Sequence, residues 1–227
     1  MALIRVKGQQ TLAVSSQGEG GDVFLRATRD GALFNADWFM GQSLAGTCYG
    51  VNTGIMTTPV TFSPVVADTM PDVLVGVPTG TTIIPTYISV CFEDTGTVLA
   101  IDTFAVVAPT YDVTLTGTEL TVMNLRVDKP KSSLCTSYGT VTANGPTFES
   151  GNFIEFWRPY GGLQEDAFNG STNWVHQNVA GSIWTVRKAV VPPICVGPAS
   201  LGVFAGAQAG TGFITVTWIE LPTASLA

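Results

Sequence analysis

Apolar, β-branched runs separated by turn residues dominate the chain between residues 72 and 108. Runs at residues 73–77, 82–92 and 98–107 are rich in Val, Ile, Thr, Tyr and Phe. Residues 78–80 (Pro-Thr-Gly) separate the first two runs, and residues 93–96 (Glu-Asp-Thr-Gly) separate the second from the third. Val, Ile, Thr, Tyr and Phe favour strands, and Gly, Pro and Asp favour turns. The segment therefore predicts three strands, with a hairpin turn at residues 93–96.

Other runs of the same composition lie before this segment and between it and the end of the chain. In the last of them Ile214, Val216 and Trp218 share one face, which we predict to be the core side. The residues predicted on the opposite face are Thr215, Thr217 and Ile219. About a dozen strands with turns between them predict an antiparallel sandwich or barrel, closed by a carboxy-terminal strand. These other runs are residues 48–58, 60–66, 111–116, 120–127, 139–142, 152–158, 182–191, 202–207 and 212–221.

The first 47 residues have a different pattern. Residues 15–21 are small and polar, which is typical of an arm or a linker. Two interpretations stay open: a frayed terminus, or an extended arm that orders against a neighbouring subunit. Asn35 is predicted to cap a short helix over residues 36–45, and Gly46 is predicted to end it.

The chain has no internal repeat and no shift in composition that would mark a second domain. The predicted organisation is an amino-terminal arm with a short helical segment over residues 1–47, one β-sandwich over residues 48–222, and a tail over residues 223–227.

Charged residues are few and unevenly placed. They make up 12% of the chain, against 45% apolar residues, and the formal net charge is −7. An ordinary soluble protein has about twice that charged share, so much of the surface is expected to face other protein. No Lys or Arg occurs between Asp30 and Leu125. Binding to nucleic acid needs clustered Lys and Arg, so direct binding of a genome by this chain is disfavoured.

The cysteines are expected to be buried small apolar residues. They are far apart in the sequence, and a disulfide framework, the alternative, is more typical of shorter chains with denser cysteine. The four are Cys48, Cys91, Cys135 and Cys195.

No membrane span or export signal is expected. The chain has no uninterrupted apolar run of about 18 residues. Arg5 and Lys7 interrupt the opening residues where a signal peptide would be apolar. Synthesis in a cytoplasm is the resulting expectation.

No pattern in the sequence predicts catalysis. The single histidine, His176, lies in a long loop over residues 158–181, and no Gly-x-Ser-x-Gly sequence accompanies it. Residues 94–96 (Asp-Thr-Gly) invite comparison with aspartic proteases, but their composition is that of a turn. The scattered cysteines and one histidine lack the spacing of a zinc site. We therefore expect no enzyme activity, no metal and no cofactor.

Aromatic residues in the late part of the chain suggest a different kind of site. A platform of exposed rings could bind sugar, as on β-sandwich lectins. Trp157 and Trp184 lie in predicted strands, and we expect them to face the core. Tyr160, Trp174 and His176 remain as candidate contacts with a ligand or a partner.

Three segments resemble a known protein family. They are residues 77–85 (Val-Pro-Thr-Gly-Thr-Thr-Ile-Ile-Pro) with the strand that follows, residues 124–126 (Asn-Leu-Arg) and residues 212–222. With Thr- and Val-rich strands on a charge-poor chain, they resemble the jelly-roll capsid proteins of viruses, in particular those that infect bacteria. The resemblance covers most of residues 48–222. It implies a two-sheet, eight-stranded jelly roll, many copies of which tile an icosahedral shell, often as trimers or pseudo-hexamers.

The resemblance sets the functional expectations. The chain would be a structural virion protein, made in the host cytoplasm, that self-assembles through sandwich edges, loops and terminal arms. Its partners would be other copies of itself, as a trimer or a larger assembly, and other virion proteins. Contact with an internal membrane stays open. Many RNA-virus coats carry an Arg-rich arm, which this chain lacks. The alternative is a carbohydrate- or receptor-binding module of a phage spike, fibre or decoration protein.

Overall fold

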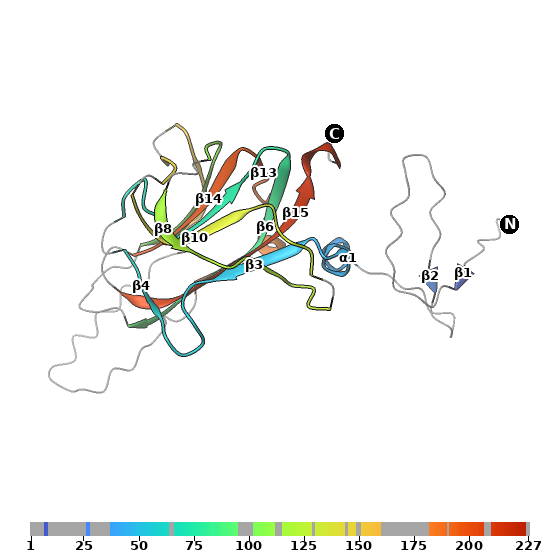
Figure 1. Cartoon of the computed structure of the whole chain (residues 1–227), viewed down its shortest axis with the longest axis horizontal. Coiled ribbons are helices and arrows are strands. Elements are labelled where there is room, and N and C mark those ends of the chain that lie inside the picture. The colour runs from blue at the N-terminus through green and yellow to red at the C-terminus, as the bar shows by residue number, and fades with distance from the viewer. Residues whose placement is uncertain are drawn as a thin grey trace.

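Two antiparallel β-sheets packed face to face form most of the structure, a computed structural model (Figure 1). The fold prediction of an antiparallel β-sandwich with one short helix is confirmed. Outside the sheets lie α1 (Trp38–Ala45) and the short 3-10 helices η1 (Val186–Lys188) and η2 (Thr223–Ser225). The structure describes residues 7–8, 26–27, 37–63, 66–94, 102–111, 115–128, 130–143, 145–148, 151–159, 182–189, 191–206 and 210–225.

The sheets contain six and seven strands. In order across it, the six-stranded sheet comprises β11 (Ile154–Trp157), β7 (Thr103–Ala108), β14 (Ala199–Ala205), β5 (Val73–Val77), β10 (Thr136–Ala143) and β8 (Thr116–Glu119). The main order of the other sheet is β12 (Ser182–Thr185), β6 (Thr81–Asp94), β15 (Thr211–Pro222), β3 (Cys48–Asn52) and β9 (Met123–Asn124). Two short strands complete it: β13 (Cys195–Val196) pairs with β6, and β4 (Val60–Thr61) pairs with β15. A separate parallel pair is formed by β1 (Lys7–Gly8) and β2 (Arg26–Ala27).

Eight of these strands pair in a nested order along the chain. The first, β3, pairs with the last, β15; β5 pairs with β14, β6 with β12, and β7 with β11, all antiparallel. The two middle strands of the eight, β7 and β11, therefore pair with each other. Each of the other pairs joins the strand before the inner pairs to the strand after them in the sequence. Among these eight strands, the first four, β3, β5, β6 and β7, alternate between the two sheets.

The predicted hairpin at residues 93–96 is wrong. The strands on either side of it, β6 and β7, belong to different sheets and do not pair. Residues 95–101 lie outside the described part of the chain. The error has a physical reason. Composition predicts that the two runs are strands, but both are apolar enough to pack in either sheet. Composition therefore does not predict which strand each one pairs with.

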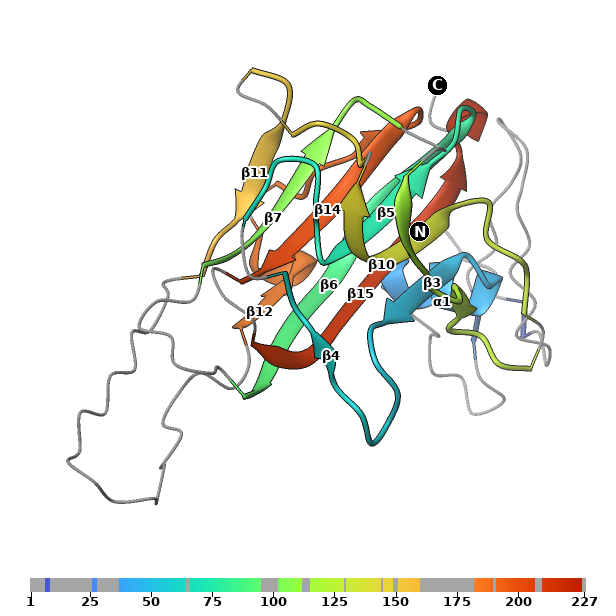
Figure 2. The same ribbon diagram turned by 60° about the vertical axis from the view of Figure 1, so that its left-hand side comes forward.

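The carboxy-terminal strand β15 is central to the seven-stranded sheet (Figure 2). Ile214, Val216 and Trp218 are fully buried, as the alternation predicts. Ile219, predicted on the opposite face, is fully buried too. The register of β15 against β6 shifts between Thr217 and Trp218, so the strict alternation ends there. Ile219 also pairs with β3 on one side and β6 on the other, which leaves it no open edge.

The helix α1 begins later than predicted and ends where predicted. Asp37 is its N-cap, and the Asp37 carboxylate accepts a hydrogen bond from the Met40 backbone N–H at 2.7 Å. The assignment of this cap to Asn35 is therefore wrong, and Asn35 lies outside the described residues. Gly46 ends the helix at φ 70°, a left-handed conformation that glycine adopts without steric cost.

Several predicted strands are shorter in the structure. The run at residues 48–58 stops being a strand after Asn52, and the run at residues 182–191 turns into η1 after Thr185. Within residues 120–127 only Met123 and Asn124 form a strand. Gly54 explains the first case, since its φ of 73° turns the chain out of the sheet.

The four cysteines are free thiols. Cys48, Cys135 and Cys195 are buried as expected, whereas Cys91 is exposed on β6, so that prediction is wrong for one of the four. Burial raises the pKa of the Cys48 thiol to about 11 and that of Cys195 to about 12. These thiols are therefore protonated and unreactive at neutral pH.

Asp72 connects three segments from inside the sandwich. Its carboxylate is 3% exposed and accepts backbone hydrogen bonds from Ser63 at 2.7 Å and Ala205 at 2.8 Å. Its own backbone N–H donates to Val203, and its carbonyl accepts from Thr140. Burial raises the pKa of the carboxyl from 3.8 to about 6, although the two accepted hydrogen bonds favour the charged form.

This pKa predicts a pH dependence of stability. Between pH 3.8 and about 6 the folded state holds the Asp72 proton more tightly than the unfolded chain does. The free energy of unfolding attributable to Asp72 is therefore greatest below pH 3.8 and falls, by at most ~3 kcal/mol, as the pH rises through 6. Urea unfolding at a series of pH values measures it.

The matched variant is Asp72→Asn, which cannot titrate. It leaves one of the two backbone N–H groups facing an amide donor, so it is expected to be less stable than wild type across the range. The wild-type minus variant difference isolates Asp72 from Glu155, whose pKa is lowered by its hydrogen bond to Arg158. An unchanged pH slope in Asp72→Asn would contradict the assignment.

Candidate functional site: exposed apolar surfaces

Several ionisable groups among the described residues make structural contacts. No group of three or more His, Cys, Asp or Glu side chains in this part of the chain is arranged to hold a metal ion. Asp72 binds backbone N–H groups, and Arg158 pairs with Glu155 and Asp102 while lying over the Phe104 ring. These contacts tie loops to strands.

The structure describes only some of the candidate aromatic residues. Trp184 is buried in the core, and the half-buried Trp157 packs against the same core cluster. Both therefore face the core, as predicted. The Trp184 ring meets the edge of Phe156 across the two sheets, with centroids 5.1 Å apart. Tyr160, Trp174 and His176 lie outside the described residues.

Exposed aliphatic side chains are the feature that a folded core does not explain. Most of them lie on three surfaces, which we call the β11–β13 groove, the β3–β4 turn and the β9 strip. Each is built on or beside short strands at the periphery of the sheets. Such surfaces mark interaction sites more often than single exposed residues do.

The β11–β13 groove is an open hollow of about 420 Å³ between the two sheets. Ile154 on β11, which is 66% exposed, forms one wall, and the exposed Ile194 and Val196 form the other. The rest of the lining comes from β7 and the residue after it, β13, β14 and the segment before β11, namely Val107, Ala108, Pro109, Gly151, Asn152, Phe153, Cys195 and Ala199. The groove therefore exposes part of the apolar interior at this side of the sandwich.

The β3–β4 turn, residues 54–58, presents two apolar side chains to solvent. Met56 is 97% exposed and Ile55 is 69% exposed. Two backbone hydrogen bonds between Ile55 and Thr58, at 3.1 and 2.9 Å, fix the turn. Gly54 is required at its start, because a Cβ there would lie 2.7 Å from the Thr58 carbonyl oxygen. The turn is thus a defined projection.

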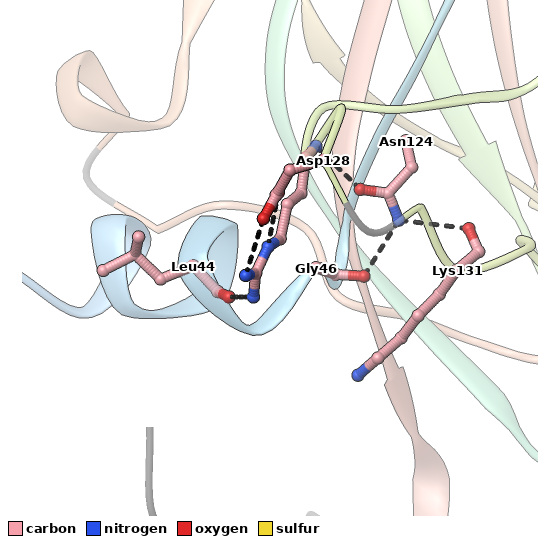
Figure 3. Close-up of polar contacts among 6 residues, drawn as sticks. Leu44, Gly46, Asn124, Asp128 and Lys131 are labelled. Atoms are coloured by element: carbon pink, nitrogen blue, oxygen red, sulfur yellow. Dashed lines mark hydrogen bonds and ion pairs between the residues drawn. The ribbon is translucent and has the colours of Figure 1, made fainter. Parts of the chain in front are cut away.

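The β9 strip consists of Met123, Leu125, Val127 and Leu134, all exposed, with Val127 at 87%. Asn124 holds it in place (Figure 3). The Asn124 amide nitrogen donates to the carbonyls of Gly46 at 3.0 Å and Lys131 at 3.1 Å, and its oxygen accepts from the Arg126 backbone N–H at 2.8 Å. One side chain thereby joins the end of α1, β9 and the following loop.

Two further side chains, Arg126 and Glu220, fix the same loop. The Arg126 guanidinium donates to the Leu44 carbonyl, near the C-terminus of α1, and pairs with Asp128. A cation is favourable there because the helix end carries partial negative charge. From β15, the Glu220 carboxylate accepts from the Ser133 hydroxyl and the Leu134 N–H. The strip is therefore held in a fixed position, although its apolar side chains face solvent.

Comparison with family models, with curated proteins and with solved structures found no match for this chain. No helix among the described residues is both long and apolar enough to cross a membrane.

Sequence reasoning did not identify these three surfaces. The turn lay inside a predicted strand, and residues 123–127 lay inside another. One signal was available: no charged residue occurs from Trp38 to Ala67. The solvent-exposed turn lies within this stretch, and a long stretch without charge is consistent with a surface that is buried against protein.

The geometry predicts the effect of removing the Asn124 side chain. Asn124→Ala deletes three hydrogen bonds and is expected to lower the free energy of unfolding by about 1–3 kcal/mol, at the usual net value per bond. It is also expected to speed proteolytic cleavage within residues 125–134, because the loop loses one of its two links to the end of α1 and keeps only the one through Arg126. Chemical unfolding and limited proteolysis measure the two effects.

Thr121→Ala serves as the comparison variant, because Thr121 is exposed and lies three residues before Asn124. If Asn124→Ala matched it in both stability and cleavage rate, Asn124 would not be the anchor of the strip.

Proposed function

We propose that this chain is a structural protein that self-assembles, through the exposed apolar surfaces of its β-sandwich, into the shell of a virus particle. The observation that carries the proposal is the set of three exposed aliphatic surfaces on a chain with few charges. Each surface would lose water-exposed apolar area on contact, at roughly 25 cal/mol per Å². The proposal includes no catalytic role.

The strand pairing supports a shell protein of the jelly-roll type. Eight strands pair first with last, second with seventh, third with sixth and fourth with fifth, and they divide evenly between two sheets. A jelly roll is a two-sheet arrangement of eight strands in Greek keys, and viral capsids and lectins both use it. Fold alone does not determine function, so the surfaces must decide between these uses.

The charge distribution supports lateral assembly. Burying an unpaired charge in an interface is costly, and charged residues are depleted from interface cores. The β3–β4 turn and the residues that line the β11–β13 groove contain no charged side chain. Contacts between copies at these places would therefore carry little desolvation cost.

The proposed setting is the virion, with copies of this chain and other virion proteins as partners. The net charge of −7, and the absence of Lys and Arg from Asp30 to Leu125, disfavour a role in neutralising a genome. The alternative, a carbohydrate- or receptor-binding module, rests on Tyr160, Trp174 and His176, and no described contact favours it.

The proposal predicts that the purified chain forms oligomers of high order at micromolar concentration. Because the surfaces are apolar, sulfate is expected to increase the assembled fraction, whereas contacts between charges would weaken as salt rises. Multi-angle light scattering across protein and sulfate concentrations measures this. A chain that stays monomeric at the highest concentration would contradict the proposal.

A further inference from the structure

We infer that the β3–β4 turn of one copy inserts into the β11–β13 groove of a second copy, forming a head-to-tail contact. The inference rests on the proposed self-assembly and names two of the surfaces that carry it. It matches a projecting apolar turn with an apolar hollow on the same chain.

The turn projects from the sandwich and the groove is a hollow, so their shapes are complementary. Met56 and Ile55 project from a turn fixed by Gly54 and the two hydrogen bonds between Ile55 and Thr58. A fixed turn loses little conformational entropy on binding. The groove of about 420 Å³ is larger than the ~150 Å³ cavity that holds a benzene-sized group, so it has room for two aliphatic side chains.

The turn and groove of one copy cannot meet each other. Beside the turn, β4 pairs with Thr211 and Gly212, at the start of β15. In the groove, β13 pairs with Thr82 and Ile83 of β6, which lie opposite Leu221 and Glu220 near the end of β15. Nine residues of strand separate these positions, roughly 30 Å. Figure 2 shows the loop between β3 and β4 projecting at the far end of the sandwich from the top of β11.

Charge is compatible with the contact. Residues 54–58 of the turn and the residues that line the groove include no charged side chain. Glu119 borders a hollow that it shares with Gly54, Ile55 and Thr58 of the turn. An uncharged, apolar centre is the usual pattern of an interface core.

A contact between two different surfaces is heterologous. Each copy offers one turn and one groove, so binding leaves a free turn at one end and a free groove at the other. Repeated binding then closes into a ring when the rotation between copies allows it. A two-fold contact, by contrast, would pair the same surface on both copies.

Two charged variants test the contact. Met56→Glu damages only the turn, and Ile154→Glu damages only the groove; both side chains are exposed, so each variant is expected to fold, as circular dichroism checks. Each alone is expected to associate at least ~100-fold more weakly than wild type, because a buried unpaired carboxylate is costly. Met56→Leu, which keeps an apolar side chain, and Val127→Glu, which changes the β9 strip, are expected to retain the contact.

Mixing the two damaged variants is the decisive step. Ile154→Glu keeps an intact turn and Met56→Glu keeps an intact groove, so a mixture is expected to form 1:1 pairs by analytical ultracentrifugation. If wild type associates but either variant associates as strongly, or if the mixture stays monomeric, the inference is overturned while the proposed function stands. If wild type itself is monomeric, the proposed function fails, and the inference with it.

Discussion

The pairing of β15 with β6 is the interaction on which the rest of the structure depends. It runs over twelve residues, from Thr211 opposite Asp94 to Pro222 opposite Thr81. On its other side β15 pairs with β3 and β4, so the last strand of the chain fills the middle of the sheet. Its inward residues, with Trp218 the largest, join the core that both sheets share. The sandwich is therefore incomplete until the carboxy-terminal segment arrives, and most of its contacts are distant in sequence.

This central position of β15 determines where the surfaces lie. Since β3 enters beside the last strand, the turn that follows β3 projects at the start of β15. The short strand β13 pairs with the opposite end of β6, and there the two sheets leave the groove open. One long strand pair thus separates two different apolar surfaces. The proposed head-to-tail contact depends on that separation, and a shell is one assembly that such contacts can build.

The sequence was a good guide to single strands and a poor guide to their partners. Long apolar runs such as β6 and β15 were predicted within two residues of their ends, because β-branched residues and the turn residues beside them act locally. The hairpin between β6 and β7 was wrong, since pairing depends on residues far away in the chain. Ile219 was placed on the solvent side because alternation cannot anticipate a register shift. The projecting Met56 was missed for a related reason: composition placed it inside a predicted strand over residues 48–58, whereas the strand ends at Asn52.

The central claim is that this sandwich is a building block of a closed shell. Electron microscopy of the purified chain, imaged under the conditions that favour association, tests it most directly. The account predicts closed particles or rings of uniform diameter, built from repeated copies of one sandwich. A field of single, unassociated sandwiches, or of amorphous aggregates with no repeating unit, would contradict it.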